Sequence, residues 1–185
     1  DGTTTNCIVP KKIKEGTKFI EIAAGGANLA IDEDGNLWTW GSNNYGQLGD
    51  GTKTNRAEPI KIKEGIKFIK VSSKGASSAA ITEDLELYTW GYGRYGQLGN
   101  GSTTDVYTPT QIASNIKFKK IEAGTAQKLA IDKDGNLYGW GLSENGRIGN
   151  GGTGNATLND GTTGGTIIQT IPMKIKSGTK FKEMA

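Results

Sequence analysis

Hydrophobic residues along this chain fall in short runs that are separated by polar turns, without the sustained spacing of a helix. Apolar residues recur in Phe19–Ala24, and two further short runs, Leu29–Ile31 and Leu37–Trp40, flank the turn sequence Asp-Glu-Asp-Gly. A polar, glycine-rich stretch follows, and Pro59–Lys63 then alternates isoleucine with lysine. Short runs with this alternation, bounded by turn residues, predict β-strands. We expect four strands here, and we expect the fourth to start at its proline, where a missing N–H costs least.

The same pattern recurs with a period of about 50 residues. Trp-Gly pairs begin at Trp40, Trp90 and Trp140, and each of the four prolines is followed nine residues later by a phenylalanine. Two landmarks in one register identify an internal repeat, and four short strands per repeat predict an all-β chain of four-stranded β-propeller blades. The expected organisation is a single partial propeller, 1–185, with repeats at about 10–58, 59–108 and 109–171, and with 172–185 starting a further repeat.

Composition narrows the functions that are open to this chain. Its 29 glycines fit a turn-rich β fold, and a formal net charge of +3 is too small to favour nucleic acid or a membrane surface. Histidine does not occur, which rules out a Ser-His or Cys-His pair, and the single cysteine, Cys7, cannot form an intramolecular disulfide. The stretch 41–46 lacks the lysine of a phosphate-binding loop, and the Asp-rich turns fit hairpins better than calcium loops. We expect no enzyme activity, no cofactor and no metal.

Lysines flank or alternate with apolar residues in several repeats. Examples are Lys11, Lys12 and Lys14, and then Lys61 and Lys63. Solvated outer faces of strands explain such positions, and edge lysines also discourage aggregation between sheets. The functional alternative is a basic rim for an acidic partner.

Three stretches carry a resemblance to a known family. Residues 40–49 read Trp-Gly-Ser-Asn-Asn-Tyr-Gly-Gln-Leu-Gly, residues 90–99 read Trp-Gly-Tyr-Gly-Arg-Tyr-Gly-Gln-Leu-Gly, and residues 140–149 are a weaker third copy. They resemble the repeat of the regulator of chromosome condensation family, in a bacterial-type member. The resemblance implies a seven-bladed propeller whose structural repeat residues are Trp40, Gly41, Gly46, Gly49, Trp90, Gly91, Gly96, Gly99, Trp140, Gly141, Gly146 and Gly149.

The chain departs from the family at one motif position. The family usually carries a histidine in the segment Gly-x-x-His-x-Leu-Ala, where this chain has Ser77 and Gln127 in the second and third copies, and Ala27 or Asn28 in the first. Each replacement is small or polar. A structural hydrogen bond can survive such a change, whereas a function that depends on imidazole cannot.

The length corresponds to about 3.7 blades, which is part or half of a seven-bladed ring. We expect either a segment of a longer propeller or one half of a two-chain ring that self-association closes, because blades bury their faces only against neighbouring blades. The third repeat also carries a Gly-rich insertion, 151–166, which fits a tolerated surface loop; a functional loop is the alternative.

The predicted partner-binding residues lie in the loops after the Trp-Gly pairs. Tyr92 and Arg94 differ between the copies, which argues against a purely structural role, and Tyr and Arg are favoured interface anchors. The full set is Tyr92, Arg94, Tyr95, Tyr45 and Asn44. Packing between blades is the alternative explanation for Tyr45 and Tyr95.

The expected function is that of a non-catalytic protein–protein interaction propeller that binds a macromolecular partner through its loop faces. The resemblance implies this role, because members of the family include a nucleotide-exchange factor for a Ran-type small GTPase, chromatin-binding proteins and a secreted bacterial inhibitor of β-lactamase. One alternative is guanine-nucleotide exchange on a small GTPase. Another is a structural module of a bacterial surface or secreted protein, and we expect a bacterial secreted or cell-surface location over a cytoplasmic one.

Overall fold

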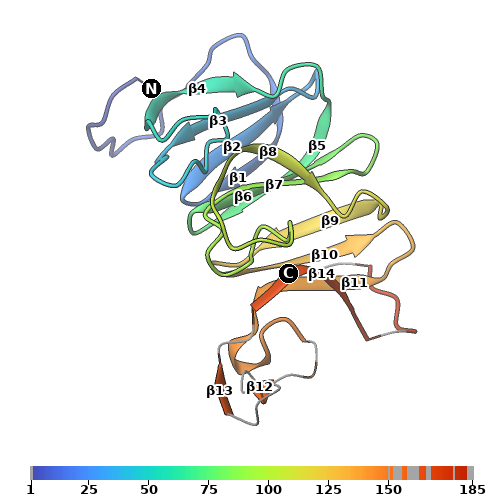
Figure 1. Ribbon diagram of the computed structural model, residues 1–185. Coiled ribbons are helices and arrows are strands. Elements are labelled where there is room, and N and C mark those ends of the chain that lie inside the picture. Colours follow the sequence, from blue (N-terminus) through green and yellow to red (C-terminus); the bar gives the residue numbers. More distant parts are fainter. Residues whose placement is uncertain are drawn as a thin grey trace.

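The chain folds into three four-stranded antiparallel sheets that follow one another in chain order (Figure 1). The computed structural model describes residues 2–149, 151, 156–157, 163–165, 168–176 and 178–182. The first sheet contains β1 (Phe19–Ala24), β2 (Ala27–Asp32), β3 (Leu37–Gly41) and β4 (Arg56–Ile62). The second contains β5 (Phe68–Lys74), β6 (Ser77–Thr82), β7 (Leu87–Gly91) and β8 (Val106–Ile112). The third contains β9 (Phe118–Ala123), β10 (Gln127–Asp132), β11 (Leu137–Leu142) and β14 (Ile168–Ile175).

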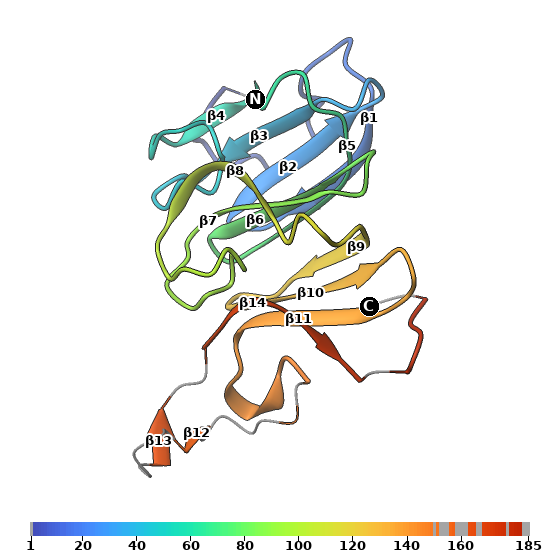
Figure 2. The same ribbon diagram turned by 45° about the vertical axis from the view of Figure 1, so that its right-hand side comes forward.

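Each sheet is one propeller blade, and the prediction of an all-β fold with four-stranded blades is confirmed. The strands of the first two sheets pair in chain order, and the third follows the order β9-β10-β11-β14. The first strands of successive blades, β1, β5 and β9, pack against one another, so they form the inner side of the array (Figure 2). The last strands, β4, β8 and β14, are therefore the outer edges of their sheets.

A carboxylate holds the hairpin between the second and third strands of a blade. Asp32 accepts hydrogen bonds from the backbone N–H groups of Asp34 (3.1 Å) and Asn36 (2.8 Å) and from the indole N–H of Trp38 (2.8 Å). Burial alone would raise its pKa, but these hydrogen bonds outweigh burial and keep the pKa of Asp32 below its usual value. Asp132 holds the equivalent turn of the third blade in the same way. These carboxylates are occupied by turn hydrogen bonds, as expected for hairpins.

The prolines do not start the outer strands, and that prediction is wrong. Pro59 is the fourth residue of β4, and Pro109 is the fourth residue of β8. A proline inside a strand removes one donor from the ladder, which an edge strand tolerates because one side of it has no partner. The pairing of β3 with β4 is also irregular between Thr39 and Gly41, on the side that faces Pro59.

Tryptophans tie each blade to the one before it. The indole N–H of Trp90 donates to the carbonyl oxygen of Gln47 (2.9 Å), and that of Trp140 donates to the carbonyl oxygen of Gln97 (3.0 Å). Both rings are fully buried. Gly99 lies so close that a Cβ there would come within 2.6 Å of the Trp140 indole nitrogen. The Trp-Gly and Gly-Gln-Leu-Gly motifs therefore meet across the interface between blades.

The first blade differs from the others in how much of its face is covered. Val71 on β5 and Ile121 on β9 are buried between blades, whereas Ile22, at the equivalent position of β1, is 75 % exposed. Trp40 is likewise half-buried. Closure of a ring by self-association stays a prediction.

Strand pairing settles the position at which the family has histidine. Ala27, Ser77 and Gln127 pair with Gly41, Gly91 and Gly141 respectively, so Ala27 and not Asn28 takes this place in the first blade.

Within the insertion, two short strands, β12 (Ala156–Thr157) and β13 (Thr163–Gly165), pair with each other. The rest of 151–166, apart from residue 151, lies outside the described residues.

Candidate functional site

Two loops, 42–55 after β3 and 92–105 after β7, carry the predicted contact residues. Each loop turns around a buried glutamine. The side-chain oxygen of Gln47 accepts a hydrogen bond from the backbone N–H of Tyr45 (2.9 Å), and that of Gln97 accepts one from Tyr95 (2.8 Å). With the glutamine turned inward, the tyrosine rings remain half exposed, at 43 % for Tyr45 and 41 % for Tyr95.

Tyr92 joins these two tyrosines into one group, which we call the tyrosine cluster (Tyr45, Tyr92 and Tyr95). Its ring centroid lies 4.9 Å from that of Tyr45 and 5.8 Å from that of Tyr95, both in edge-to-face geometry. Tyr45 belongs to the first blade and the other two belong to the second, so the cluster spans the junction of two blades. Burial raises the pKa of Tyr92, and the ring presents an uncharged hydroxyl at neutral pH.

Cations lie in the two loops that carry the tyrosine cluster. Arg94, between Tyr92 and Tyr95 in the chain, is exposed, as is Asn44 in the first loop. The ammonium of Lys53 lies 4.9 Å from the ring centroid of Tyr107, and a hydrogen bond with Tyr107 raises the pKa of Lys53. The charge of Arg94 acts on Lys53 as well, so the two cations share one region.

The acids of these loops are held in internal contacts. Asp50 accepts hydrogen bonds from the guanidinium of Arg56 (2.7 Å) and from the hydroxyl of Thr52 (2.7 Å). Burial opposes ionisation, but these bonds outweigh it and keep the pKa of Asp50 below its usual value. Asp105 accepts a hydrogen bond from the backbone N–H of Gly93 (2.9 Å). The exposed charges of this region are those of Arg94 and Lys53, and the charge of half-buried Asp105 also acts on Lys53.

The sequence did not single out Tyr107 or Lys53. Tyr107 is 36 % exposed, and its ring packs against Gly46 at the base of the first loop. Alignment of the repeats could have identified Tyr107. It occupies the position of Ala57 in the first blade, so an exposed aromatic residue replaces a small one there. Strand registers alone do not show that β8 brings this ring against the loop of the preceding blade.

The equivalent loop of the third blade lacks the cluster. Leu142, at the position of Tyr92, is buried, and Glu144 stands at the position of Arg94. Asn145 replaces the exposed tyrosine and adopts a left-handed backbone with φ of 55° within the short 3-10 helix Glu144–Gly146. The exposed tyrosines of these loops are thus confined to the first two blades, and the arginine of the third loop, Arg147, pairs with Glu144.

The glycines predicted to be structural have a shared conformation. All nine adopt positive φ, between 66° and 108°, a region that glycine enters without the steric cost other residues incur. They are Gly41, Gly46, Gly49, Gly91, Gly96, Gly99, Gly141, Gly146 and Gly149. These positions shape the loops, and none lies in a phosphate-binding arrangement of the kind that ends in lysine and serine or threonine.

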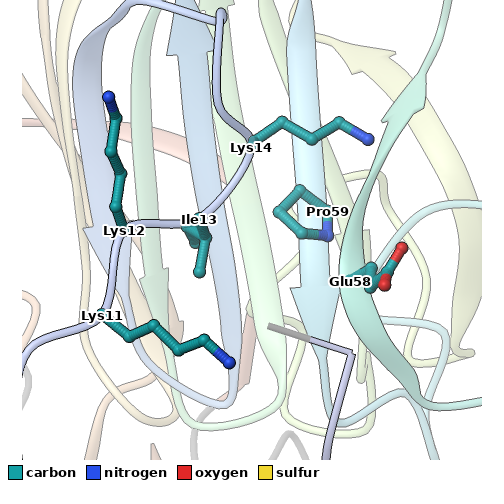
Figure 3. A pocket seen from close by; sticks show the side chains of 6 residues that line it. All are labelled: Lys11, Lys12, Ile13, Lys14, Glu58 and Pro59. Carbon is teal, nitrogen blue, oxygen red and sulfur yellow. The ribbon is translucent and has the colours of Figure 1, made fainter.

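A concave region with a volume of about 220 Å³ lies between the segment 11–14 and β4, outside the two loops (Figure 3). Lys11 and Lys14 extend toward the side where Glu58 and Pro59 lie, and Lys12 points elsewhere. The ammonium of Lys14 lies 5.0 Å from the ring centroid of Trp38, and that of Lys61 lies 5.1 Å from it. Cation–π packing on the outer face of the first blade accounts for these two lysines, so we place the candidate site at the tyrosine cluster.

The described part of the chain contains no group of three or more cysteine, aspartate or glutamate side chains that could hold a metal ion. Cys7 is exposed and free. No helix within the described residues is long and apolar enough to cross a membrane.

Comparison with solved structures identifies proteins that share this fold. The chain is similar to Prp20p from Saccharomyces cerevisiae, which binds Gsp1p and histones, at 22 % identity and a TM-score of 0.72 over 86 % of this chain and 39 % of that one. It is similar to human WBSCR16 at 22 % identity and a TM-score of 0.73 over 90 % of this chain and 40 % of that one. The chain therefore spans about two fifths of the length of these proteins.

Comparison of the sequence with family models identifies the family. No curated protein matches the chain. A family model for the regulator of chromosome condensation (RCC1) repeat matches residues 34–81 and 86–131, which is just over half of the chain, and a second model for this repeat matches residues 19–47. The matched stretches include the first two Trp-Gly motif tryptophans, Trp40 and Trp90, and the strands on either side of them. The chain belongs to the family of proteins built from RCC1 repeats.

Proposed function

We propose that this chain is a non-catalytic binding module that holds a protein partner at the tyrosine cluster. The observation that carries the proposal is the contact of half-buried Tyr92 with the exposed rings of Tyr45 and Tyr95, which joins loops of two blades into one aromatic surface. Two positions in these loops also differ among all three copies of the repeat. Here Ser42, Tyr92 and Leu142 occupy one loop position, and Asn44, Arg94 and Glu144 another.

The chemistry of the cluster suits a protein interface. Tyrosine gives a large contact area at a small loss of side-chain freedom, and it adds a hydroxyl that can donate or accept a hydrogen bond. The edge-to-face contacts of Tyr92 with both neighbours hold the three rings in place before binding. A surface that is arranged in advance loses less entropy when the partner arrives.

Charge favours a partner with acidic groups. Arg94 and Lys53 face outward, whereas Asp50 and Asp105 are held by Arg56 and by the Gly93 N–H. Arginine can pair with a carboxylate through two parallel hydrogen bonds, which adds orientation as well as attraction. A carboxylate-bearing segment placed over Tyr92 would meet Arg94, whose charge acts on that ring.

The experiment that tests the proposal places a photo-reactive phenylalanine analogue at position 95 and, as a control, at position 133 in the third blade. Both positions are exposed and neither has a left-handed backbone, but only position 95 belongs to the tyrosine cluster. We expect a discrete cross-linked protein from the first and none from the second. Equal cross-linking at both positions would contradict a site at the cluster.

Two other functions stay predictions from the sequence: guanine-nucleotide exchange on a small GTPase, and a structural module of a surface or secreted protein. A likeness of fold at 22 % identity does not choose between them. A nucleotide-release assay with the cross-linked partner distinguishes exchange from binding, if that partner is a GTPase.

A further inference from the structure

We propose that Lys128 is a proton-controlled latch between the second and third blades: its neutral amine keeps β10 packed under the loop that carries Tyr92, Arg94 and Tyr95, and its ammonium loosens that contact. The inference concerns a residue outside the binding surface. Only its effect on partner binding rests on the proposed function.

Lys128 is fully buried, which is unusual for a lysine. Its side chain crosses from β10 to the second blade, where its Nζ lies 2.6 Å from the hydroxyl oxygen of Ser77. An ammonium has three donors to satisfy, and a serine hydroxyl accepts from one of them. A charged Lys128 would therefore leave donors unsatisfied in the interior, at a large cost in free energy.

The groups that the neighbouring elements turn toward Lys128 are uncharged. On β11 it pairs with Trp140, on β9 it pairs with Ala123, and β6 presents Ser77. Burial is what lowers the pKa of Lys128, to about 7, from an ordinary value near 10.5. The neutral and charged forms are therefore close in population at physiological pH.

The junction between the second and third blades also contains a buried donor that has no partner in the part of the chain that the structure describes. The side-chain nitrogen of Gln97 is buried and has no hydrogen-bond partner among the described residues. In the first blade the equivalent nitrogen of Gln47 reaches the hydroxyl of Ser42 (3.4 Å), and Tyr92 replaces that serine in the second. This junction therefore contains an amide donor without an acceptor, and no charged group of the described residues acts on the amine of Lys128.

A short path connects Lys128 to the binding loop. Ser77 pairs with Gly91 at the start of that loop, and the backbone N–H of Tyr92 donates to the carbonyl oxygen of Ala76 (2.9 Å). Further along the same loop, the carbonyl oxygen of Gln97 accepts a hydrogen bond from the indole of Trp140, the strand partner of Lys128. Loss of contact between β10 and Ser77 would therefore act on both ends of the segment 91–97.

The direction of the pH effect follows from linkage. Between about pH 7 and pH 10.5 the opened interface binds a proton that the closed one does not, so a fall in pH through this range favours opening. With these two pKa values, the opening equilibrium is roughly 30-fold larger at pH 6 than at pH 8.5. Below pH 6 little further change is expected, because both forms are then protonated.

Amide hydrogen exchange tests the latch without any partner. Protection of residues 91–99 and of β10, corrected for the intrinsic pH dependence of exchange, should fall roughly 30-fold in the native chain between pH 8.5 and pH 6. Lys128→Met, which keeps the length without the charge, should abolish that change, and Lys133→Met, at an exposed lysine of the same blade, should leave it intact. Lys128→Ser, which copies the residue of the second blade, serves if the methionine variant does not fold.

Direct titration of the Lys128 amine by nitrogen NMR gives the second readout. A pKa near 7 supports the latch, and a pKa near 10.5 overturns it. Equal pH dependence of exchange in the native chain and in Lys128→Met would also overturn it. Neither measurement involves the binding partner, so the latch and the proposed function can fail separately. If both hold, the affinity for the cross-linked partner should fall between pH 8.5 and pH 6 in the native chain but not in Lys128→Met.

Discussion

The junction between the first and second blades and the junction between the second and third share a backbone frame but differ in their buried polar groups. In both, the phenylalanine that starts the next blade donates its N–H to a turn carbonyl of the previous one at 2.8 Å, and a tryptophan indole donates to a glutamine carbonyl. At the first junction, Ser78 adds a hydroxyl bond to the carbonyl of Gln47 (2.8 Å). At the second, the equivalent residue is the buried Lys128.

The repeat specifies how the blades pack against each other. The identity of a few buried polar residues determines how stable each junction is. The first junction satisfies its donors with serine hydroxyls and backbone carbonyls. The second contains an amine with one acceptor and an amide nitrogen with none among the described residues. Buried donors without acceptors cost more than a made hydrogen bond gains, so we expect the second junction to be the weaker one.

Removal of a junction tryptophan should have the largest effect on stability. Trp90→Ala and Trp140→Ala should each lower the free energy of unfolding by about 3–5 kcal/mol, because a fully buried ring and its indole hydrogen bond are lost together. Trp40→Ala, at a half-buried ring, should cost clearly less. Urea unfolding measures all three. If Trp40→Ala lowered the free energy of unfolding as much as the other two substitutions do, the losses would not depend on contacts between blades.

Transfer of the lysine to the first junction should have the next largest effect. Ser78→Lys should lower the free energy of unfolding at pH 7 by about 3 kcal/mol, because the amine is buried and the hydroxyl bond to Gln47 is lost. The loss should shrink as pH rises toward 10, since a neutral amine is easier to bury. Ser78→Ala is the control, with a loss of about 1 kcal/mol that does not depend on pH. A pH-independent result for Ser78→Lys would mean that the new side chain reaches solvent.

The smallest expected effect is the difference in stability between substitutions of the two loop glutamines. Gln47→Met removes two hydrogen bonds, to the Tyr45 N–H and to Ser42, whereas Gln97→Met removes the bond to the Tyr95 N–H and relieves an unsatisfied amide. We expect Gln47→Met to be the more destabilising by about 1 kcal/mol. Thermal unfolding of the two variants side by side checks this, and the reverse order would show that the amide of Gln97 is satisfied in solution.

The sequence predicted the blades well because their signals are local. Alternation in Phe19–Ala24, the Asp-Gly turns and the fixed step between Trp40, Trp90 and Trp140 each depend on neighbours in the chain. The start of β4 was wrong because only the assembled sheet shows that Pro59 lies on an outer edge.

The sequence predicted the candidate site only in part. Tyr92 was named because it differs between the copies, and Tyr45 and Tyr95 were named as loop aromatics, but the contact of Tyr45 with Tyr92 joins two blades and needs the fold. Lys128 lies among alternating residues of a strand and looks like a solvated position in the sequence. Its side chain is buried against the preceding blade, and no local pattern in the sequence predicts that.

The most direct test of the binding account is the affinity of the cross-linked partner for matched loop variants. Tyr92→Ala should raise the Kd at least tenfold, because the ring is the centre of the cluster and truncation of such an anchor costs more than about 1.4 kcal/mol. Asn145→Ala, an exposed residue of the third loop, should leave the Kd unchanged. An unchanged Kd for Tyr92→Ala in a folded chain would contradict the account and move the binding surface away from the first two blades.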